Sequence, residues 1–359
     1  MKNPLLVTKS FLPPLEEYVR YLKLIWKNGV LTNDGRFVKQ FEGELKANAG
    51  TAFAICTANA TIALQLALRT LPPGGEIITT PFSFIATTSS IMWEGFVPVY
   101  ADIDPKTLNI DPKEIEKKIT RKTKAILAVH VFGNPCDIEA INKIAKKHKL
   151  TVIYDACHAL GISYKGKPLF SYGDISVTSF HATKLLNTAE GGAMFTNNPR
   201  TAKRLKLARN FGYENYVIHT LGINGKMNEL SASLGLAGMK YLPKIIAKRK
   251  AAYNLYMQLL KETDNFDFQH FSTGQNYSYL PVILRTEKLK KQLMKALNAQ
   301  NIFPREYFSP SLETVFGGKP SCKNALDISK RILCLPLSVH ITPAEIRKVC
   351  STVNKVCAA

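Results

Sequence analysis

Lys184 is the residue of this sequence whose position most clearly suggests chemistry. It lies between two apolar segments, one containing Ile175 and Val177 and the other reading AMFTN at 193–197, and small residues and glycines surround it. Both segments are predicted to be buried strands. Burial lowers the pKa of a lysine, so that its amine becomes a nucleophile able to hold an aldehyde covalently. The alternative is a structural or solvated lysine at a strand end.

Asp155 is the second candidate, because it ends the apolar segment 150–154, which is predicted to be another buried strand. Open α/β sheets bind ligands at the carboxyl ends of their strands. Although 29 residues separate Asp155 from Lys184, their side chains can therefore converge at one edge of a sheet. We expect a ligand site at that edge.

A run of small and polar residues from Thr57 to Thr61 precedes an apolar helical segment at 62–71. The free backbone N–H groups at such a helix start can bind an anion, and phosphate is the natural ligand. The alternative is an ordinary capped helix, with Thr57 or Asn59 as the cap. Phe82 and Phe84 follow another predicted strand, where an aromatic ring can stack on a flat cofactor or pack in the core.

The elements that must position these residues alternate between short apolar strands and helices of about a dozen residues from residue 52 onward. This pattern predicts an α/β fold with a mostly parallel central sheet and helices on both faces. Residues 1–239 are expected to form an N-terminal arm and a large domain, and residues 240–359 a small C-terminal α+β domain. Pro243 should divide or kink the long helical stretch in which it lies.

The composition, with 46% hydrophobic and 21% charged residues in 359, is typical of a soluble globular protein. No apolar run is long enough to span a membrane, and the N-terminus lacks the pattern of a signal peptide. Seven cysteines without CxxC pairs argue against a disulfide framework or a metal site, and for a reducing cytoplasm.

The formal net charge of +21 leaves two interpretations open, a polyanion-binding surface or a solvated lysine-rich one. The lysines are spread along helices, and the sequence contains no helix-turn-helix or RNA-binding signature. We therefore expect no nucleic-acid partner, although the charge would attract a small polyanionic substrate such as a nucleotide diphosphate.

Several stretches together resemble one family. They are ALQLAL, PFSFIAT, VYADIDPKTLNIDP, TKAILAVHVFGNPCDI, VIYDACHALG, SFHATK, EGGAMFTNNP, ARNFG, GINGKMNELSASLG and LPLS. In this order they are similar to the DegT/DnrJ/EryC1/StrS sugar aminotransferases, which are fold type I enzymes dependent on pyridoxal 5'-phosphate (PLP). The resemblance runs from about residue 5 to residue 345, so it covers nearly the whole chain.

The resemblance implies a role for each matching residue. Lys184 matches the lysine that binds the cofactor aldehyde and later carries protons, and it is the expected catalytic residue. Asp155 matches the carboxylate that keeps the pyridine nitrogen protonated, Phe84 the ring-stacking aromatic, and His158 a position facing the ring where the family often has Gln. The expected cofactor contacts are Ala60, Thr61, Phe84, Asp155, His158, Ser179, Lys184, Asn224 and Lys226.

Two of these positions carry further implications. Relatives usually have glycine at position 60, so Ala60 requires a negative φ there. Asn224 and Lys226 match a loop that, in the family, comes from a second subunit and completes the phosphate site. The resemblance thus implies a homodimer with its active site at the interface. Sugar dehydratases of the family have histidine in place of the lysine, so Lys184 favours transamination.

The activity that the resemblance implies is transfer of an amino group from L-glutamate to a nucleotide-linked keto sugar. The stretches TTPFSFIATTSSIMWEG and VTKSFLPPLEEY favour dTDP-4-keto-6-deoxy-D-glucose as acceptor, giving dTDP-4-amino-4,6-dideoxy-D-glucose for O-antigen or lipopolysaccharide biosynthesis. The alternatives are a C3 aminotransferase, a GDP-perosamine-type synthase, or a non-catalytic regulator on the same fold. Thr32, Asn187 and Tyr307 are candidate substrate contacts, because they fall in family loops near the cofactor.

Overall fold

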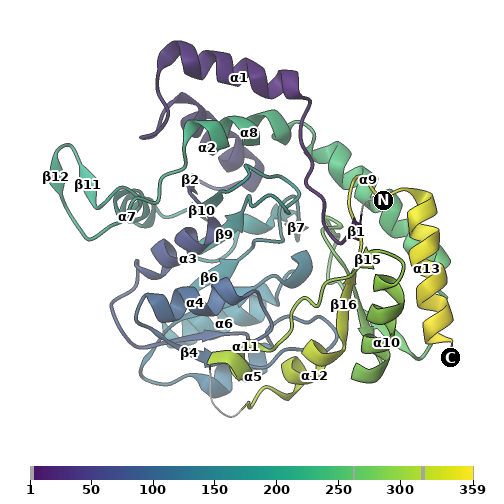
Figure 1. The fold of residues 1–359 in the computed structure, drawn as a ribbon. Coiled ribbons are helices and arrows are strands. Elements are labelled where there is room, and N and C mark those ends of the chain that lie inside the picture. Colours follow the sequence, from purple (N-terminus) through teal and green to yellow (C-terminus); the bar gives the residue numbers. More distant parts are fainter. Residues whose placement is uncertain (1–3, 262, 317–319, 359) are drawn as a thin grey trace.

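A seven-stranded sheet forms the centre of the molecule (Figure 1). The computed structural model describes residues 4–261, 263–316 and 320–358. Along the sheet the order is β2-β10-β9-β6-β5-β3-β4. The bounds are β2 Phe53–Thr57, β3 Glu76–Thr79, β4 Val97–Tyr100, β5 Thr123–Val129, β6 Thr151–Asp155, β9 Ile175–Ser179 and β10 Gly192–Thr196. The strands from β9 to β4 pair in parallel, and β10 is antiparallel to both β9 and β2. The predicted mostly parallel sheet is confirmed.

Helices cover both faces of this sheet because its central strands are apolar on both sides. One face carries α2 (Arg36–Ala49), α5 (Pro112–Lys118), α6 (Ile138–His148) and α8 (Glu229–Met239), whose buried side chains join one core. The other face carries α3 (Ala60–Leu68), α4 (Ile85–Trp93) and α7 (Pro199–Arg209), which form a second core. The parallel strands therefore bring their carboxyl ends to one edge, where their connections can form a site.

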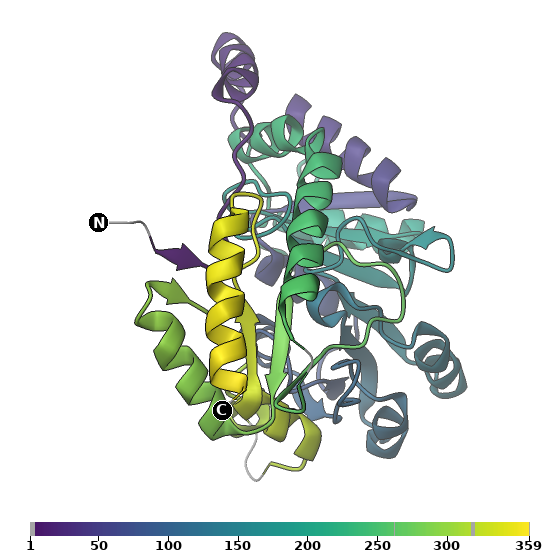
Figure 2. The same cartoon turned by 90° about the vertical axis from the view of Figure 1, so that its right-hand side faces the viewer.

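A three-stranded antiparallel sheet, here called the small sheet, lies toward the C-terminus (Figure 2). It consists of β13 (Phe266–Phe268), β14 (Leu280–Leu284) and β16 (Ile332–Leu335). The helices α9 (Leu242–Leu259), α10 (Glu287–Asn298) and α13 (Pro343–Cys357) pack around it in a separate core. Pro243 lies in the first turn of α9, so the expected division of the helical stretch is confirmed.

The N-terminal segment crosses from the small sheet's side of the molecule to the turn after β9. Its short strand β1 (Leu5–Leu6) pairs in parallel with β15 (Ile302–Phe303). Farther along, the Val7 carbonyl oxygen accepts a hydrogen bond from Leu337 N (3.1 Å). The Phe11 carbonyl oxygen accepts one from the side chain of Asn187 (2.8 Å). We call residues 5–11 the N-terminal strap.

The remaining elements are shorter or lie outside the two main sheets. They are α1 (Leu15–Asn28), α11 (Leu312–Phe316), α12 (Lys323–Arg331), the 3-10 helices η1 (Val131–Gly133) and η2 (Leu169–Ser171), and the hairpins β7 (Ser163–Tyr164) with β8 (Lys167–Pro168) and β11 (Tyr213–Glu214) with β12 (Val217–Ile218). Among the described helices, none is both long and apolar enough to cross a membrane.

Candidate active site

Asp155 ends β6 at the carboxyl edge of the central sheet, as predicted from its position after an apolar strand. Its side chain is only 6% exposed. One carboxylate oxygen accepts a hydrogen bond from Thr87 Oγ1 of α4 (2.9 Å), and the other accepts one from Cys157 N (3.2 Å). These two donors hold the carboxylate in one orientation.

Lys184 follows β9 in a tight turn at the same edge, where its backbone N–H donates to His181 O (2.9 Å). Its amine interacts electrostatically with Asp155, Cys157 and Tyr279, so the predicted convergence with Asp155 is present. Burial is the largest single influence on the pKa of Lys184 and lowers it, but these neighbours together raise the pKa above its usual value. The expectation of a lowered pKa is wrong for this chain, because burial brings the amine close to acidic groups that stabilise its charge.

His158 presents a flat, neutral ring beside the lysine. Its Nδ1 accepts a hydrogen bond from Phe132 N (3.2 Å), so its proton lies on Nε2. The ring is stacked in parallel with those of Phe132 and Phe308, at centroid distances of 6.0 and 5.9 Å. Burial, with a smaller contribution from the charge of Lys184, holds the pKa of His158 well below its usual value.

The small-residue turn lies at the start of α3 and leaves the first amides of that helix facing outward. Asn59 caps the helix, its side chain accepting from Ile62 N (2.9 Å). Ala60 is the first residue of α3 and has a negative φ, so its departure from the family's glycine causes no strain. Gly192 of β10 lies so close that a Cβ there would be 2.7 Å from Ala60 N. Thr61, the second residue of α3, is exposed.

Ser179, the last residue of β9, belongs to the same edge. Its hydroxyl accepts a hydrogen bond from His181 N (3.2 Å), and the residue lines one small cavity together with His158 and Lys184. The hydroxyl proton of Ser179 remains available to an anion, because the hydrogen bond from His181 N uses the oxygen as an acceptor.

The two candidate aromatics differ in exposure. Phe84, at the N-cap of α4, is 57% exposed and can offer its ring to a ligand. Phe82 is fully buried, and its ring meets that of Phe308 edge-on at 5.7 Å. Core packing is therefore the role of Phe82, and Phe84 stays the candidate for stacking.

Asn224 and Lys226 lie on a loop that runs beside β2 of the same chain. The loop carbonyl of Gly225 accepts from Ala58 N (2.9 Å), and Lys226 forms a β-bridge with Thr57. The Lys226 amine donates to the side chain of Asn210 (2.9 Å). The loop thus lies next to the predicted phosphate turn.

Arg209 holds the loop of Asn224 and Lys226 next to the end of β2. The guanidinium is buried, it binds both carboxylate oxygens of Asp34 (2.7 and 2.6 Å), and it donates to Glu42 and to the Cys56 carbonyl oxygen (both 2.7 Å). The Arg209 carbonyl oxygen accepts from Gly225 N (2.9 Å). One buried cation therefore joins the end of β2 to the loop that carries Asn224 and Lys226.

The three candidate substrate contacts lie in different settings. Tyr307 is half-buried, and the centroid of its ring is 5.8 Å from that of Tyr279. The charge of Lys184 also acts on the Tyr307 hydroxyl. Asn187 is buried and uses its amide within the chain, donating to Phe11 O (2.8 Å) and accepting from Ala189 N (3.3 Å). Thr32 is exposed in the loop between α1 and α2.

Two residues of the site were missed by the sequence analysis. Thr87 orients Asp155, and Tyr279 shares a small cavity with Lys184 and interacts electrostatically with its amine. Thr87 lies one helical turn after Phe84 in the quoted stretch PFSFIAT, which is a signal that could have found it. Tyr279 lies just before β14, on a different sheet from Lys184, and the sequence pattern of a strand does not reveal that contact.

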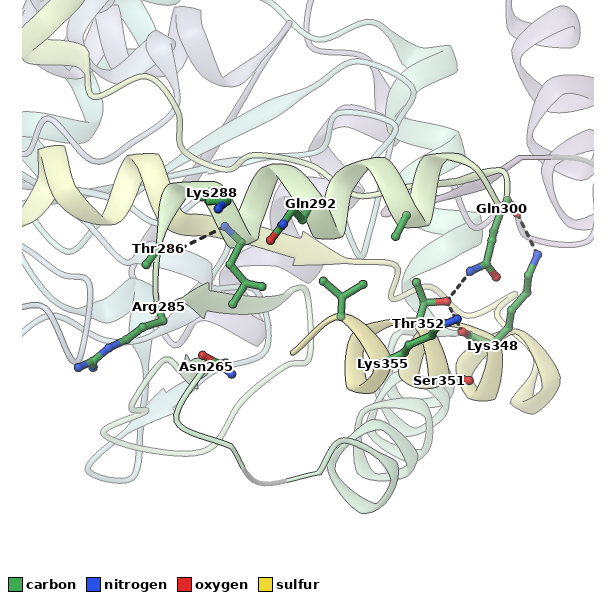
Figure 3. A pocket seen from close by; sticks show the side chains of 13 residues that line it. Asn265, Arg285, Thr286, Lys288, Gln292, Gln300, Lys348, Ser351, Thr352 and Lys355 are labelled. Carbon is green, nitrogen blue, oxygen red and sulfur yellow. Dashed lines mark hydrogen bonds between the residues drawn. The ribbon is translucent and has the colours of Figure 1, made fainter. Parts of the chain in front are cut away.

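A larger groove, of ≈ 940 Å³, lies elsewhere, between α10 and α13 (Figure 3). It contains none of the residues discussed above. Its polar lining includes four basic side chains, and some contacts already occur within it, such as Lys348 with Gln300 O (2.9 Å) and Gln300 with Thr352 (2.7 Å). The candidate active site is therefore defined by its chemistry and not by the size of its cavity.

The side chains at the sheet edge fit pyridoxal phosphate. Lys184 supplies an amine for the aldehyde, and the buried carboxylate of Asp155 suits a protonated ring nitrogen. The uncovered amides at the start of α3, kept open by Gly192, suit the phosphate. The exposed ring of Phe84 suits the flat face of the cofactor.

Comparisons with known proteins agree with this fit. The model of the DegT/DnrJ/EryC1/StrS aminotransferase family matches residues 15–354. The chain is 39% identical to a dTDP-4-amino-4,6-dideoxy-D-glucose transaminase of Shigella dysenteriae, over 99% of this chain and 100% of the relative. It is 32% identical to a GDP-perosamine synthase of Caulobacter vibrioides, over 91% of each.

Solved structures give the same answer. DesI, determined in the presence of its TDP-sugar product, has a TM-score of 0.95 and 31% identity, over 99% of this chain and 94% of that chain. NtdA from Bacillus subtilis, with bound cofactor PMP, has a TM-score of 0.88 and 29% identity, over 96% of this chain and 82% of that chain. The chain therefore has the fold of the fold type I enzymes that use PLP.

Proposed function

The chain belongs to the DegT/DnrJ/EryC1/StrS aminotransferase family and is a PLP-dependent sugar aminotransferase, and on that premise we propose its substrates. It transfers the amino group of L-glutamate to C4 of dTDP-4-keto-6-deoxy-D-glucose, giving dTDP-4-amino-4,6-dideoxy-D-glucose. The observation that carries the chemistry is the convergence of Lys184 with Asp155 at the edge of the central sheet. The choice of sugar is supported by the activity for which the Shigella relative is named.

When bound, pyridoxal phosphate supplies an aldehyde that takes up and releases amino groups and a ring that accepts electrons from the reacting carbon. Asp155 would hold a proton on the ring nitrogen, and Thr87 fixes the orientation of the carboxylate. The exposed Phe84 would stack on one face of the ring. His158, neutral and with its proton on Nε2, can donate a hydrogen bond toward the ring.

The phosphate end is held by groups from two elements. The amides of Ala60 and Thr61, with the Thr61 hydroxyl, come from the start of α3, and the Ser179 hydroxyl comes from the end of β9. The dipole of α3 adds to the attraction. Because the phosphate turn and the lysine turn both extend from the sheet edge, one rigid scaffold sets the distance between the two ends of the cofactor.

Lys184 carries the proton. Its Nζ accepts the proton that leaves the α-carbon of glutamate and later returns a proton to the sugar carbon that receives nitrogen. The acidic neighbours that raise its pKa favour the protonated state, which is the state needed to return the proton.

We propose that the enzyme is a homodimer in which Asn224 and Lys226 reach the phosphate site of the partner subunit. An apolar groove beside Thr61 supports this, because it is lined in part by the exposed side chains of Trp93 and Leu221, 82% and 70% exposed. Apolar surface of this kind next to a ligand site is typical of a subunit interface.

We propose that the enzyme serves the biosynthesis of a cell-surface polysaccharide. The product suits O-antigen or lipopolysaccharide biosynthesis, which uses amino sugars of this kind. The cysteines of the described chain are all free, which fits a reducing cytoplasm. No nucleic acid takes part.

A GDP-perosamine-type synthase is the second candidate, and the Caulobacter relative favours it. A C3 aminotransferase and a non-catalytic regulator are further alternatives. The regulator would bind a polyanion through the basic surface and would turn over no keto sugar; binding of DNA across a salt series tests it.

The deciding experiment incubates the enzyme with L-glutamate and dTDP-4-keto-6-deoxy-D-glucose and identifies the product by NMR. The proposal predicts an equatorial amine at C4. An axial amine, an amine at C3, or turnover of only a GDP-linked keto sugar would contradict it.

A further inference from the structure

Tyr279 reaches from the small sheet to the lysine turn of the central sheet. It is almost fully buried, and its ring meets the His158 ring edge-on, with centroids 4.8 Å apart. Lys184, His158 and Tyr279 line the same small cavity, where the Tyr279 hydroxyl interacts electrostatically with the Lys184 amine. None of the cofactor contacts described above uses this tyrosine.

A buried cation holds the backbone that leads to Tyr279. Arg249 of α9 is 5% exposed. Its Nε donates to the carbonyl oxygen of Tyr277 (2.9 Å) and its Nη2 to that of Ser278 (2.7 Å). Buried charges are costly unless they are paired or fully hydrogen-bonded. The chain thus commits a buried guanidinium to fixing the two residues directly before Tyr279.

The same segment is tied to the histidine at the site. The side-chain amide of Asn276 donates to the carbonyl oxygens of His158 (2.8 Å) and Leu160 (2.9 Å). Its carbonyl oxygen accepts from Ser278 N (3.1 Å). Arg249 and Asn276 thus fix the backbone directly before Tyr279, and the buried Tyr279 ring packs on His158 before any ligand arrives.

We propose that Tyr279 is a positioning residue for proton transfer, whose hydroxyl holds the Lys184 amine whenever that amine is not bonded to the cofactor. The inference rests on the proposed function, since an aminotransferase must release its lysine in each half-reaction and then use it as a proton carrier. A freed lysine has several rotatable bonds, and a fixed partner limits the positions that it can reach.

The groups that face the amine come from separate elements. Asp155 and Cys157 lie at the end of β6, and Tyr279 lies before β14; these three favour the charged amine. His158 and Tyr307 interact electrostatically with the Lys184 amine. Arg249 lines the same cavity but directs its guanidinium to backbone carbonyls.

The test removes only one oxygen atom, in the variant Tyr279→Phe. Burial of Lys184 then continues to oppose its charge, while one stabilising partner is lost, so the pKa of the amine should fall. The full-length chain, stripped of PLP, is labelled with trace acetic anhydride over a pH series, and peptide mass spectrometry reports each lysine. Lys184 in the variant should become reactive at lower pH, with about a tenfold gain in labelling for each pH unit that the midpoint moves.

Two controls exclude a general loss of structure. Lys290 is buried and paired with Glu306, so its labelling rises only if the fold opens. Tyr256→Phe removes another buried tyrosine hydroxyl, one that donates to Pro336 O (2.8 Å) in the core of the small sheet. Tyr256→Phe should leave the Lys184 profile unchanged, and Lys290 should stay unreactive in both variants. The proposal is wrong if Lys184 labels alike in Tyr279→Phe and the wild type, or if Lys290 becomes reactive together with it.

A second readout uses the PLP-loaded enzyme and the reaction with glutamate alone. The acidic limb of the pH–rate profile should move to lower pH in Tyr279→Phe, with the rate reduced and the KM for glutamate unchanged. This half-reaction needs no sugar. A labelling shift without any wild-type turnover of the keto sugar would therefore overturn the substrate proposal alone, and normal turnover without a labelling shift would overturn the role of Tyr279 alone.

Discussion

Both oxygens of the Asp155 carboxylate are occupied by donors of the chain, one by the hydroxyl of Thr87 and one by the amide of Cys157. Such a carboxylate has one orientation in which it can also hold a protonated ring nitrogen. Asp155→Asn should lower the rate of transamination by a factor on the order of 100 or more, because the neutral amide no longer favours the ring proton. Stopped-flow measurement with saturating PLP checks this.

Thr87→Val provides the matched control for that substitution. It keeps the charge of Asp155 and removes one hydrogen bond to it, so a smaller loss, about tenfold, is expected. Equal losses in the two variants would mean that orientation, and not charge, is what Asp155 contributes.

His130 makes stability depend on pH. Burial lowers its pKa to about 3, so in acid the unfolded chain takes up a proton that the folded chain does not. The contribution of His130 to the free energy of unfolding should therefore be fully present above the ordinary histidine pKa. Below that pH the free energy of unfolding should fall by about 1.4 kcal/mol per pH unit from this group. His158 contributes with the same sign.

Urea titrations between pH 6.5 and 4 test this dependence. His130→Asn can still accept the hydrogen bond that Nδ1 receives from Cys136 N (3.1 Å), and it does not titrate. The slope for this variant should be smaller by one proton. An unchanged slope would show that His130 is not the source.

At the scale of single residues, the sequence predicts best where one strand decides the position. Lys184 and Asp155 could be found because each follows an apolar strand whose end lies at the sheet edge. The contact with Tyr279 could not, because it depends on how the small sheet packs against the central one. The raised pKa of Lys184 was missed for the same reason, since the acidic neighbours come from other elements.

Among the elements, the N-terminal strap ties the small sheet's side of the molecule to the lysine turn. The strap ends at Phe11, whose carbonyl oxygen accepts a hydrogen bond from Asn187. Asn187 lies three residues after Lys184 in the sequence. Asn187→Ala should lower the free energy of unfolding by about 1–3 kcal/mol, because it leaves buried groups without partners, and it should weaken PLP binding with little effect on the KM for the sugar.

Chemical denaturation and a titration with PLP measure these two effects. The alternative is that Asn187 binds the substrate, as its place in a family loop suggests. In that case the variant would unfold like the wild type and show a raised KM for the sugar. Removal of residues 1–11 should reproduce the stability loss and exceed it, since it also removes β1.

The strands and most helices were predictable, because apolar runs alternate with amphipathic ones and Pro243 marks a helix start. Two features were not. One is the reversed direction of β10, whose connection to β9 (residues 180–191) contains no helix, although parallel neighbours are usually joined through one. The pairing of β1 with β15 joins residues almost 300 positions apart, and two-residue strands carry no periodic signal.

For the molecule as a whole, we propose that residues 1–239 and 240–359 form two domains, with the strap crossing between them. The site lies where they meet, since Lys184 extends from the central sheet and Tyr279 from the small one. The composition and charge of the chain predicted a globular protein but did not indicate that the site lies between the two proposed domains.

The proposed dimer predicts complementation between damaged subunits. Lys184→Ala removes the lysine of a subunit's own site, whereas Lys226→Ala affects the site of its partner. Random mixing after mild denaturation should restore about one quarter of wild-type activity, because half of the dimers are mixed and each mixed dimer has one intact site. Light scattering gives the oligomeric state, and no recovery in a dimeric mixture would mean that each site uses its own Lys226.

The central claim is that Lys184 is the residue to which pyridoxal phosphate becomes attached and through which the reaction runs. The most direct measurement reduces the PLP-loaded protein with borohydride and maps the modified peptide by mass spectrometry, for the wild type and for Lys184→Ala. We predict one pyridoxyl group on Lys184, loss of the yellow colour on reduction, and neither label nor transamination in the variant. A label on another lysine, or a Lys184→Ala protein that still transaminates, would contradict the claim.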